Sequence, residues 1–298
     1  MATFFLAKVV WPDALWLHVN WRKPLEDAGI FVLCIWVFAV FLQSVNREIF
    51  RTAEGYWPRG LRRRFKGSHC EKFRKLKAKF EQLYNQSGAL SDEQEEELSE
   101  LSRRLAREYP SKTSLILPTS FGNAVRAYED YSRVIYGFES INGWARLQGL
   151  MSKDFREILG NDRARVDLWL NLFVLALFFA LELAVVAAIK ECSLAVLLVP
   201  LLAFAWLAYA RSRSSAQQFG EQVKAAFDIY LPELATRLGF MLSSETAKNR
   251  KFWQAFSQVM VYRDAGALQE MMNAGLKRIS AATKETGSAE TTTDPEDD

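Results

Sequence analysis

The chain has 298 residues, of which 50% are hydrophobic and 24% are charged, and its formal net charge is +3. Its three cysteines, Cys34, Cys70 and Cys192, are too scattered for a disulfide framework or a zinc site, and we expect no metal and no cofactor. The small net charge is an average over one basic block and two acidic segments, so the chain is analysed segment by segment.

Residues 1–27 contain Trp11, Trp16 and Trp21, and no basic region precedes their apolar part. A signal peptide needs such a basic region, whereas indole rings favour the membrane–water boundary. We therefore expect an extracytoplasmic, interfacial segment, with a loose apolar end as the alternative. Residues 28–45 follow as an uncharged apolar run of 18 residues, which predicts the first transmembrane helix.

A basic block directly follows this predicted span. Between Arg59 and Lys79 the sequence holds ten basic residues and one acid, Glu71. In this position the block predicts contact with anionic lipid headgroups, retention on the cytoplasmic side, or both. A protein partner is another interpretation, and nucleic acid is not expected because no recognition motif accompanies the block. The candidate lipid contacts are Arg59, Arg62, Arg63, Arg64 and Lys66.

Residues 69–109 predict a charged helical hairpin within a cytoplasmic domain over 46–165. Apolar residues recur every three or four positions over His69–Tyr84, as in a helix with one apolar face. Ser91 and Gln94 have the spacing of a capping box at the start of the second helix. The acids that follow Ser91 lack the glycine and spacing of an EF-hand, so they indicate a solvated helix face rather than a calcium site.

The next predicted helix covers Ala124–Tyr136, and Gly137 ends it by taking a left-handed conformation. Glu129 and Arg133 are four residues apart in this helix, which predicts an ion pair. A separate short helix over Ser152–Leu159 leads back to the membrane.

Two apolar runs, residues 166–189 and 193–210, predict the second and third transmembrane helices as a hairpin. Lys and Arg are frequent on both outer flanks of this hairpin and scarce at its tip, so both ends of the hairpin are expected in the cytoplasm. The N-terminus lies across the first predicted span from the basic block and is expected outside. Cys192 at the tip is interpreted as a small turn residue, with a disulfide between subunits as the alternative. Pro200 is expected to kink the third span.

Glu182 lies well inside the first of these two runs, and Asn171 lies three helical turns before it. An unpaired charge at membrane depth is costly, which makes Glu182 and Asn171 the intramembrane polar candidates. Packing or assembly of helices is the favoured role, and ion conduction or proton handling is the alternative.

After the third span, residues 211–283 predict a cytoplasmic helical segment that Leu231–Pro232 divides. Residues 284–298 are rich in acids, Ser and Thr and predict a disordered tail.

Several short stretches between residues 46 and 262 form a pattern of their own. They are Glu54–Pro58, Leu117–Thr119, Gly122–Asn123, Arg126–Ala127, Glu129, Tyr136–Gly137, Trp144–Leu147, Phe227–Tyr230, Glu233–Leu234, Arg250, Phe252–Trp253 and Phe256. Together they resemble a group of bacterial multi-span membrane proteins of unassigned function. The resemblance implies an architecture and no activity, so it adds no catalytic residue.

Together these features predict an all-α, polytopic membrane protein with three transmembrane helices and a helical cytoplasmic domain made from two chain segments. The sequence has no P-loop, dinucleotide-binding, metalloprotease or nucleophile-elbow motif, and only two histidines. The missing motifs favour a non-enzymatic protein, and the resemblance implies a bacterial inner-membrane protein. It would organise or anchor a membrane-associated assembly, as a homo-oligomer or with a protein partner. An oligomeric channel or membrane-disrupting effector in a defence or stress system is the alternative.

Overall fold

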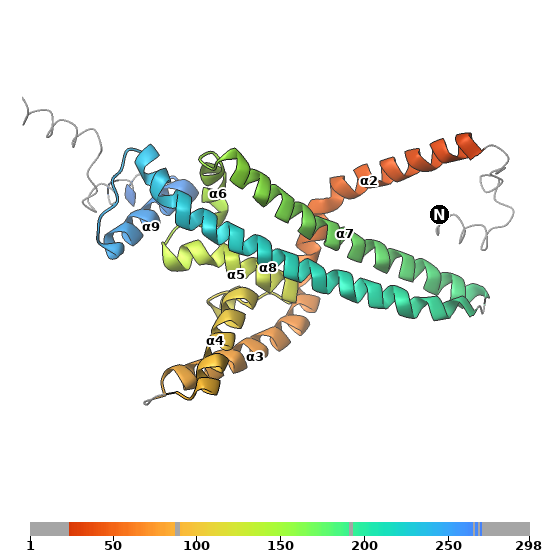
Figure 1. Cartoon of the computed structure of the whole chain (residues 1–298), viewed down its shortest axis with the longest axis horizontal. Helices are drawn as coiled ribbons and strands as arrows, with labels where there is room; N and C mark the ends of the chain where they lie inside the picture. Colours follow the sequence, from red (N-terminus) through yellow and green to blue (C-terminus); the bar gives the residue numbers. More distant parts are fainter. Residues whose placement is uncertain (1–23, 87–89, 191–192, 265, 268, 270–298) are drawn as a thin grey trace, which may run out of the picture. The chain divides into compact units, whose positions relative to one another are not determined.

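The structure is a computed structural model that describes residues 24–86, 90–190, 193–264, 266–267 and 269. These residues form helices and turns without a β-strand, which confirms the all-α class (Figure 1). The predictions for residues 1–23, Cys192 and the tail at 284–298 lie outside the described residues. The elements are α2 (Pro24–Glu54), α3 (Arg59–Tyr84), α4 (Asp92–Glu108), η2 (Thr113–Leu115), α5 (Ser120–Ile135), α6 (Ser140–Gln148), α7 (Lys153–Lys190), η3 (Ser193–Leu197), α8 (Leu198–Arg237) and α9 (Thr246–Tyr262).

The chain divides into two compact units, each built from several segments. Unit 1 comprises the described part of Met1–Ser68 together with Leu117–Gly122 and Asp162–Ala216. Unit 2 comprises the described residues of His69–Ile116, Asn123–Asn161 and Gln217–Asp298. The boundaries fall inside α3, α5, α7 and α8, so these four helices contribute residues to both units.

Three predicted helix boundaries are wrong. The helix predicted from His69 begins at Arg59, so the first part of the basic block is helical as well. The helix predicted from Ala124 begins at Ser120. The short helix at Ser152–Leu159 is continuous with the second predicted span as α7, because no proline interrupts the chain between them.

Two expectations about proline are also corrected. Pro232 lies inside α8 and does not divide it, and the helix continues to Arg237. Leu231, Leu234 and Ala235 are buried around this position, and their packing offsets the backbone hydrogen bond that proline removes. Pro200 lies in the first turn of α8, where proline is tolerated without a kink.

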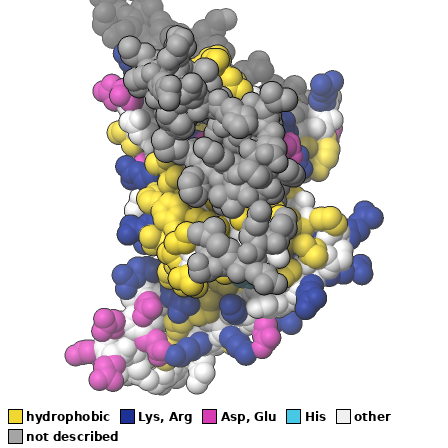
Figure 2. Space-filling view, turned by 90° about the vertical axis from the view of Figure 1, so that its right-hand side faces the viewer, with side chains coloured by type: hydrophobic (Ala, Val, Ile, Leu, Met, Phe, Trp, Pro, Cys, Tyr) yellow, Lys and Arg dark blue, Asp and Glu magenta, His cyan; other side chains and the backbone are white. Residues whose placement is uncertain are grey.

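Two helices among the described residues, α7 and α8, are long and apolar enough to cross a membrane. Large apolar side chains along them are exposed, among them Leu181 on α7 and Trp206 on α8. Figure 2 shows hydrophobic side chains on the surface of the face that it draws. The third span predicted at residues 28–45 is not among these candidates. That stretch is nevertheless helical, and its described side chains include exposed Trp36 and Phe41.

In unit 1, the end of α2 packs against the start of α5. Gly55 has φ +94°. Its N–H donates to the carbonyl of Thr52 at 3.0 Å, and the N–H of Tyr56 donates to the carbonyl of Arg51 at 3.1 Å. These two bonds form a Schellman motif, which satisfies the last carbonyls of α2. The hydroxyl of Thr119 donates to the carbonyl of Ala53 at 2.7 Å, and this bond joins α2 to the segment before α5.

The same region of unit 1 reaches α7 and α8. Phe50 lies edge-to-face against buried Phe121 at 5.1 Å, and the guanidinium of Arg163 lies 4.0 Å from the Phe50 ring centre. The N–H of Phe121 donates to the Tyr209 hydroxyl at 3.3 Å. Residues from four helices therefore meet around Phe121.

In unit 2, α3 and α4 form the predicted hairpin (Figure 1). Ser91 and Gln94 make both hydrogen bonds of the capping box, as predicted. An ion pair between Lys79 and Glu97 joins the two helices. Phe73, Tyr109 and Ile116 pack into a buried apolar cluster at the base of the hairpin.

An aromatic core holds α5, α6, α8 and α9 together in unit 2. Phe138 is fully buried, with ring centres at 5.2 Å to Trp253, 5.9 Å to Phe227 and 6.2 Å to Phe256. Gly143 leaves room for this ring, since a Cβ there would lie 2.1 Å from Phe138. Gly137 has φ +80°, which confirms the predicted left-handed cap after α5.

Candidate functional site, an aromatic cavity in unit 2

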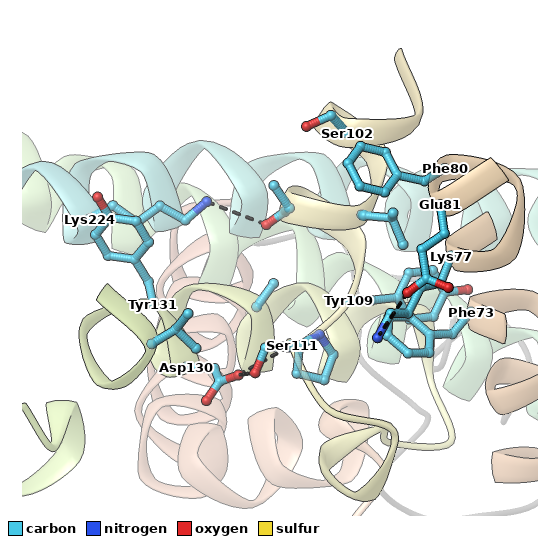
Figure 3. A pocket seen from close by; sticks show the side chains of 15 residues that line it. Phe73, Lys77, Phe80, Glu81, Ser102, Tyr109, Ser111, Asp130, Tyr131 and Lys224 are labelled. Atoms are coloured by element: carbon cyan, nitrogen blue, oxygen red, sulfur yellow. Dashed lines mark hydrogen bonds and ion pairs between the residues drawn. The ribbon is translucent and has the colours of Figure 1, made fainter. Parts of the chain in front are cut away.

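Unit 2 contains a cavity of about 380 Å³, a size in the range of small-molecule and side-chain binding pockets. Figure 3 shows Phe73, Phe80 and Tyr109 on one side of it and Tyr131 on the other. Segments far apart in the sequence supply its walls. The lining residues are Phe73, Lys77, Phe80, Glu81, Ser102, Leu105, Ala106, Tyr109, Pro110, Ser111, Ala127, Asp130, Tyr131, Val134 and Lys224.

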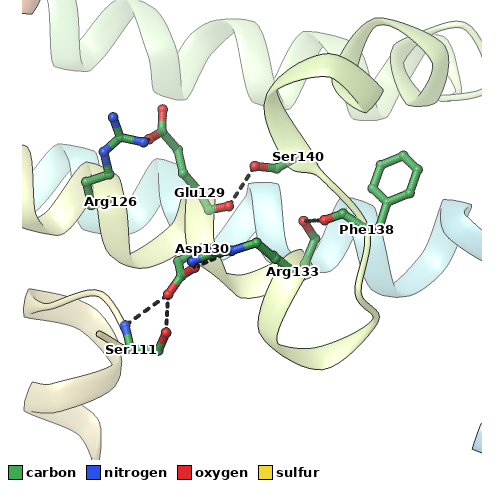
Figure 4. Close-up of polar contacts among 8 residues, drawn as sticks. Ser111, Arg126, Glu129, Asp130, Arg133, Phe138 and Ser140 are labelled. Carbon is green, nitrogen blue, oxygen red and sulfur yellow. Dashed lines mark hydrogen bonds and ion pairs between the residues drawn. The ribbon is translucent and has the colours of Figure 1, made fainter. Parts of the chain in front are cut away.

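Asp130 fixes the cavity wall between the α4–α5 connection and α5 (Figure 4). Its carboxylate accepts from the backbone N–H of Ser111 at 3.0 Å and from the Ser111 hydroxyl, and its side chain is only 4% exposed. Arg133 Nε donates to the same carboxylate at 3.0 Å. Burial raises the pKa of Asp130, but the hydrogen bonds from Ser111 and Arg133 outweigh it and the net pKa is lowered.

The predicted ion pair between Glu129 and Arg133 is wrong, because Arg133 pairs with Asp130 and Glu129 pairs with Arg126 at 3.1 Å. The more deeply buried Asp130 needs the compensation more than the partly exposed Glu129 does. Burial raises the pKa of Glu129, and the charge of Arg126 opposes this shift only in part.

On the α8 side, Asp228 accepts hydrogen bonds from two tyrosines, Tyr131 at 3.0 Å and Tyr136 at 2.7 Å. Burial and the neighbouring Asp228 raise the pKa of Tyr131 to about 12, and the same causes raise that of Tyr136. Both phenols are therefore neutral hydrogen-bond donors near neutral pH.

Lys224 connects α8 to α4 at the edge of the cavity. Its side chain is 14% exposed, and Nζ lies 3.2 Å from a Glu221 carboxylate oxygen and 3.5 Å from the carbonyl of Ala106. The same Nζ lies 5.7 Å above the Tyr131 ring. Lys224 is thus held in place by its neighbours.

The arrangement suits binding better than covalent chemistry. Asp130 and Asp228 accept hydrogen bonds that join different segments, and Glu129 and Glu221 each form an ion pair within their own helix. Over the described ranges no group of three or more His, Cys, Asp or Glu is placed to hold a metal ion. The cavity walls are mostly apolar and aromatic, which favours an apolar or aromatic guest.

The residues singled out from the sequence do not line this cavity. Glu182 and Asn171 lie on α7 in unit 1, where Glu182 Oε2 and Asn171 Oδ1 are inaccessible to solvent and have no hydrogen-bond partner. The basic candidates Arg59, Arg62, Arg63, Arg64 and Lys66 occupy the first two turns of α3, also in unit 1.

Sequence reasoning missed Asp130 and Lys224 as cavity residues. Tyr136 and Asp228 both belong to stretches that carry the resemblance, and this was the one available signal, although it did not indicate that they pair. No family model, curated protein or solved structure matches the chain.

Proposed function

We propose that the chain is a bacterial inner-membrane protein that is not an enzyme and that holds a protein partner through the cavity of unit 2. The cavity carries this proposal, because it is an aromatic recess whose polar neighbours are committed to structural contacts. The exposed apolar lengths of α7 and α8 support the membrane location. In this account α7 and α8 anchor the chain, with residues 28–45 as a third span, and unit 2 lies on the cytoplasmic side.

The experiment places a photo-crosslinking amino acid at Phe80, which lines the cavity, in full-length protein in its membrane. The matched control carries the same group at Glu93, an exposed α4 residue that does not line the cavity. We expect an adduct of one defined mass at Phe80 and none at Glu93. Equal labelling at both positions, or none at either, would contradict the proposal.

A blocking variant makes this test specific for the cavity. Ala106 lines the cavity and is exposed, so Ala106→Trp fills the recess without disturbing a buried core. Ala78→Trp, on an exposed position of α3 away from the cavity, is the control. The Phe80 adduct should disappear in Ala106→Trp and persist in Ala78→Trp.

A second candidate function is an oligomeric channel or membrane-disrupting effector. One observation favours it, since Glu182 and Asn171 have buried side-chain oxygens without partners within a candidate span. Ion flux through liposomes containing the wild-type chain, with a reduced flux for Glu182→Gln, would favour this alternative over the proposed anchor.

A further inference from the structure

The connection between α2 and α3, in unit 1, carries two aromatic side chains, Tyr56 and Trp57, that contact neighbouring residues. Trp57 Nε1 donates to the carbonyl of Thr52 at 2.8 Å, and its ring lies edge-to-face against Phe65 at 5.5 Å. The guanidinium of Arg51 lies 5.3 Å from the ring centre of Tyr56. Trp57 is therefore held beside the first turns of α3 by two independent contacts.

These first turns expose an apolar face. Leu61 is 54% exposed and Phe65 is 47% exposed, and the two lie one turn apart on the same side of the helix. Single exposed apolar residues are common on soluble proteins. Here the partly exposed Trp57 packs against Phe65 and extends this apolar face.

The arginines around this face differ from the lysines further along α3. Lys75 pairs with Glu71 at 2.7 Å, Lys77 pairs with Glu81 at 3.6 Å, and Lys79 pairs with Glu97. Within the described ranges, no ion pair is found for the exposed arginines of the first two turns. These are Arg59, Arg62, Arg63 and Arg64.

Helix geometry places these arginines at different angles to the apolar face. At about 100° per residue, Arg62 and Arg64 lie about 80° to either side of the midline between Leu61 and Phe65. Arg59 and Arg63 lie about 140° or more from that midline. Arg62 and Arg64 thus flank the apolar face, whereas Arg59 and Arg63 point away from it.

We propose that residues 56–66 form a binding surface for the anionic phospholipids of the bilayer. Trp57, Leu61 and Phe65 enter the boundary between headgroups and acyl chains, and Arg62 and Arg64 bind lipid phosphates. A surface made for nucleic acid would leave its charges, not an aliphatic side chain, at the centre of the contact. This inference rests on the proposed membrane location and names the lipid class that the chain contacts there.

The test uses the full chain, with its three native cysteines replaced, in vesicles of phosphatidylcholine alone or mixed with phosphatidylglycerol. An environment-sensitive fluorophore is attached at Ser68→Cys, which lies on the same side of α3 as Phe65. The control fluorophore is attached at Gly67→Cys, which points away and has open space around it. Quenching by a nitroxide on lipid headgroups reports contact with the bilayer surface.

We expect strong quenching at position 68 in the mixed vesicles and weak quenching in phosphatidylcholine alone or at position 67. Arg62→Gln with Arg64→Gln should weaken the apparent affinity for phosphatidylglycerol about 30-fold, while Arg59→Gln with Arg63→Gln has a smaller effect. Equal losses in the two pairs, quenching independent of phosphatidylglycerol, or displacement by an RNA oligonucleotide would overturn the proposal. Alkaline extraction of the same membranes separates this failure from a failure of the membrane location, because an anchored chain stays in the pellet in every variant.

Discussion

At the scale of single residues, Asp130 illustrates how a buried charge is retained. Its carboxylate receives hydrogen bonds from Ser111 and Arg133, so the cost of burial is offset by charge-assisted bonds. The neighbouring Glu129 has one ion pair and a raised pKa. The pKa values of these two adjacent acids are therefore shifted in opposite directions, and so are their contributions to the pH dependence of stability.

Asp130→Asn should destabilise unit 2 by about 1.5–3 kcal/mol near neutral pH, because bonds to a charged acceptor become bonds to a neutral one. The folded pKa of Asp130 lies below its ordinary 3.8, so the carboxylate contributes stability above that pH and loses it as the pH falls through the folded value. Denaturant unfolding at a series of pH values in detergent should therefore show a smaller acid-induced loss for Asp130→Asn than for wild type. Equal acid slopes would contradict the assignment.

Glu129→Gln should change the pH dependence with the opposite sign. The folded pKa of Glu129 is raised above 4.5, so its contribution is fully present at lower pH and is lost as the pH rises through the folded value. The variant should remove this loss, so its stability curve is flatter than that of wild type just above pH 4.5. The same series of denaturant unfolding experiments measures this pH dependence. A steeper loss of stability in the variant than in wild type just above pH 4.5 would contradict a raised pKa for Glu129.

At the scale of elements, the contact between the end of α2 and the start of α5 depends on a glycine. A Cβ at Gly122 would lie 2.1 Å from the carbonyl oxygen of Glu54. This oxygen belongs to the backbone, so it moves only if one of the two helices moves.

Gly122→Ala should destabilise unit 1 by about 1–3 kcal/mol, the usual range for an overpacked contact. Gly67→Ala is the matched control, because nothing lies within 4 Å of its Cβ position on α3. The control should be neutral or more stable by up to about 1 kcal/mol, since alanine favours helix. Thermal unfolding of the two variants tests this difference in stability. Equal midpoints would show that the chain accommodates a methyl group between Gly122 and Glu54 without cost.

Features with local causes could be predicted from the sequence. The capping box at Ser91 and the left-handed Gly137 depend on residues within one turn, and both were correct. The early start of α3 and the continuity of α8 through Pro232 were missed, because tertiary packing and neighbouring turns decide where a helix ends. Ion-pair choice in α5 also failed, since Ser111 approaches Asp130 from another segment.

At the scale of the whole molecule, the cavity could not be predicted, because its walls come from α3, α4, the following connection, α5 and α8. Apolar spacing indicated that these helices have buried faces, but not that Phe80 and Tyr131 would line one recess. The apolar runs at 166–189 and 193–210 were easier, because length and composition alone identify them. The membrane location is therefore inferred from the sequence, and the candidate binding site from the structure.

The central claim is that α7 and α8 cross a membrane with unit 2 on the cytoplasmic side. The most direct measurement is labelling of single cysteines in intact cells with a thiol reagent that does not cross membranes. One chain keeps native Cys192 between α7 and α8, and the other has only Ser102→Cys on an exposed position of α4 in unit 2. We predict that Cys192 is labelled in intact cells and that the cysteine at position 102 is labelled only after the membrane is opened. Labelling of both before opening, or recovery of the chain in the soluble fraction, would contradict the account.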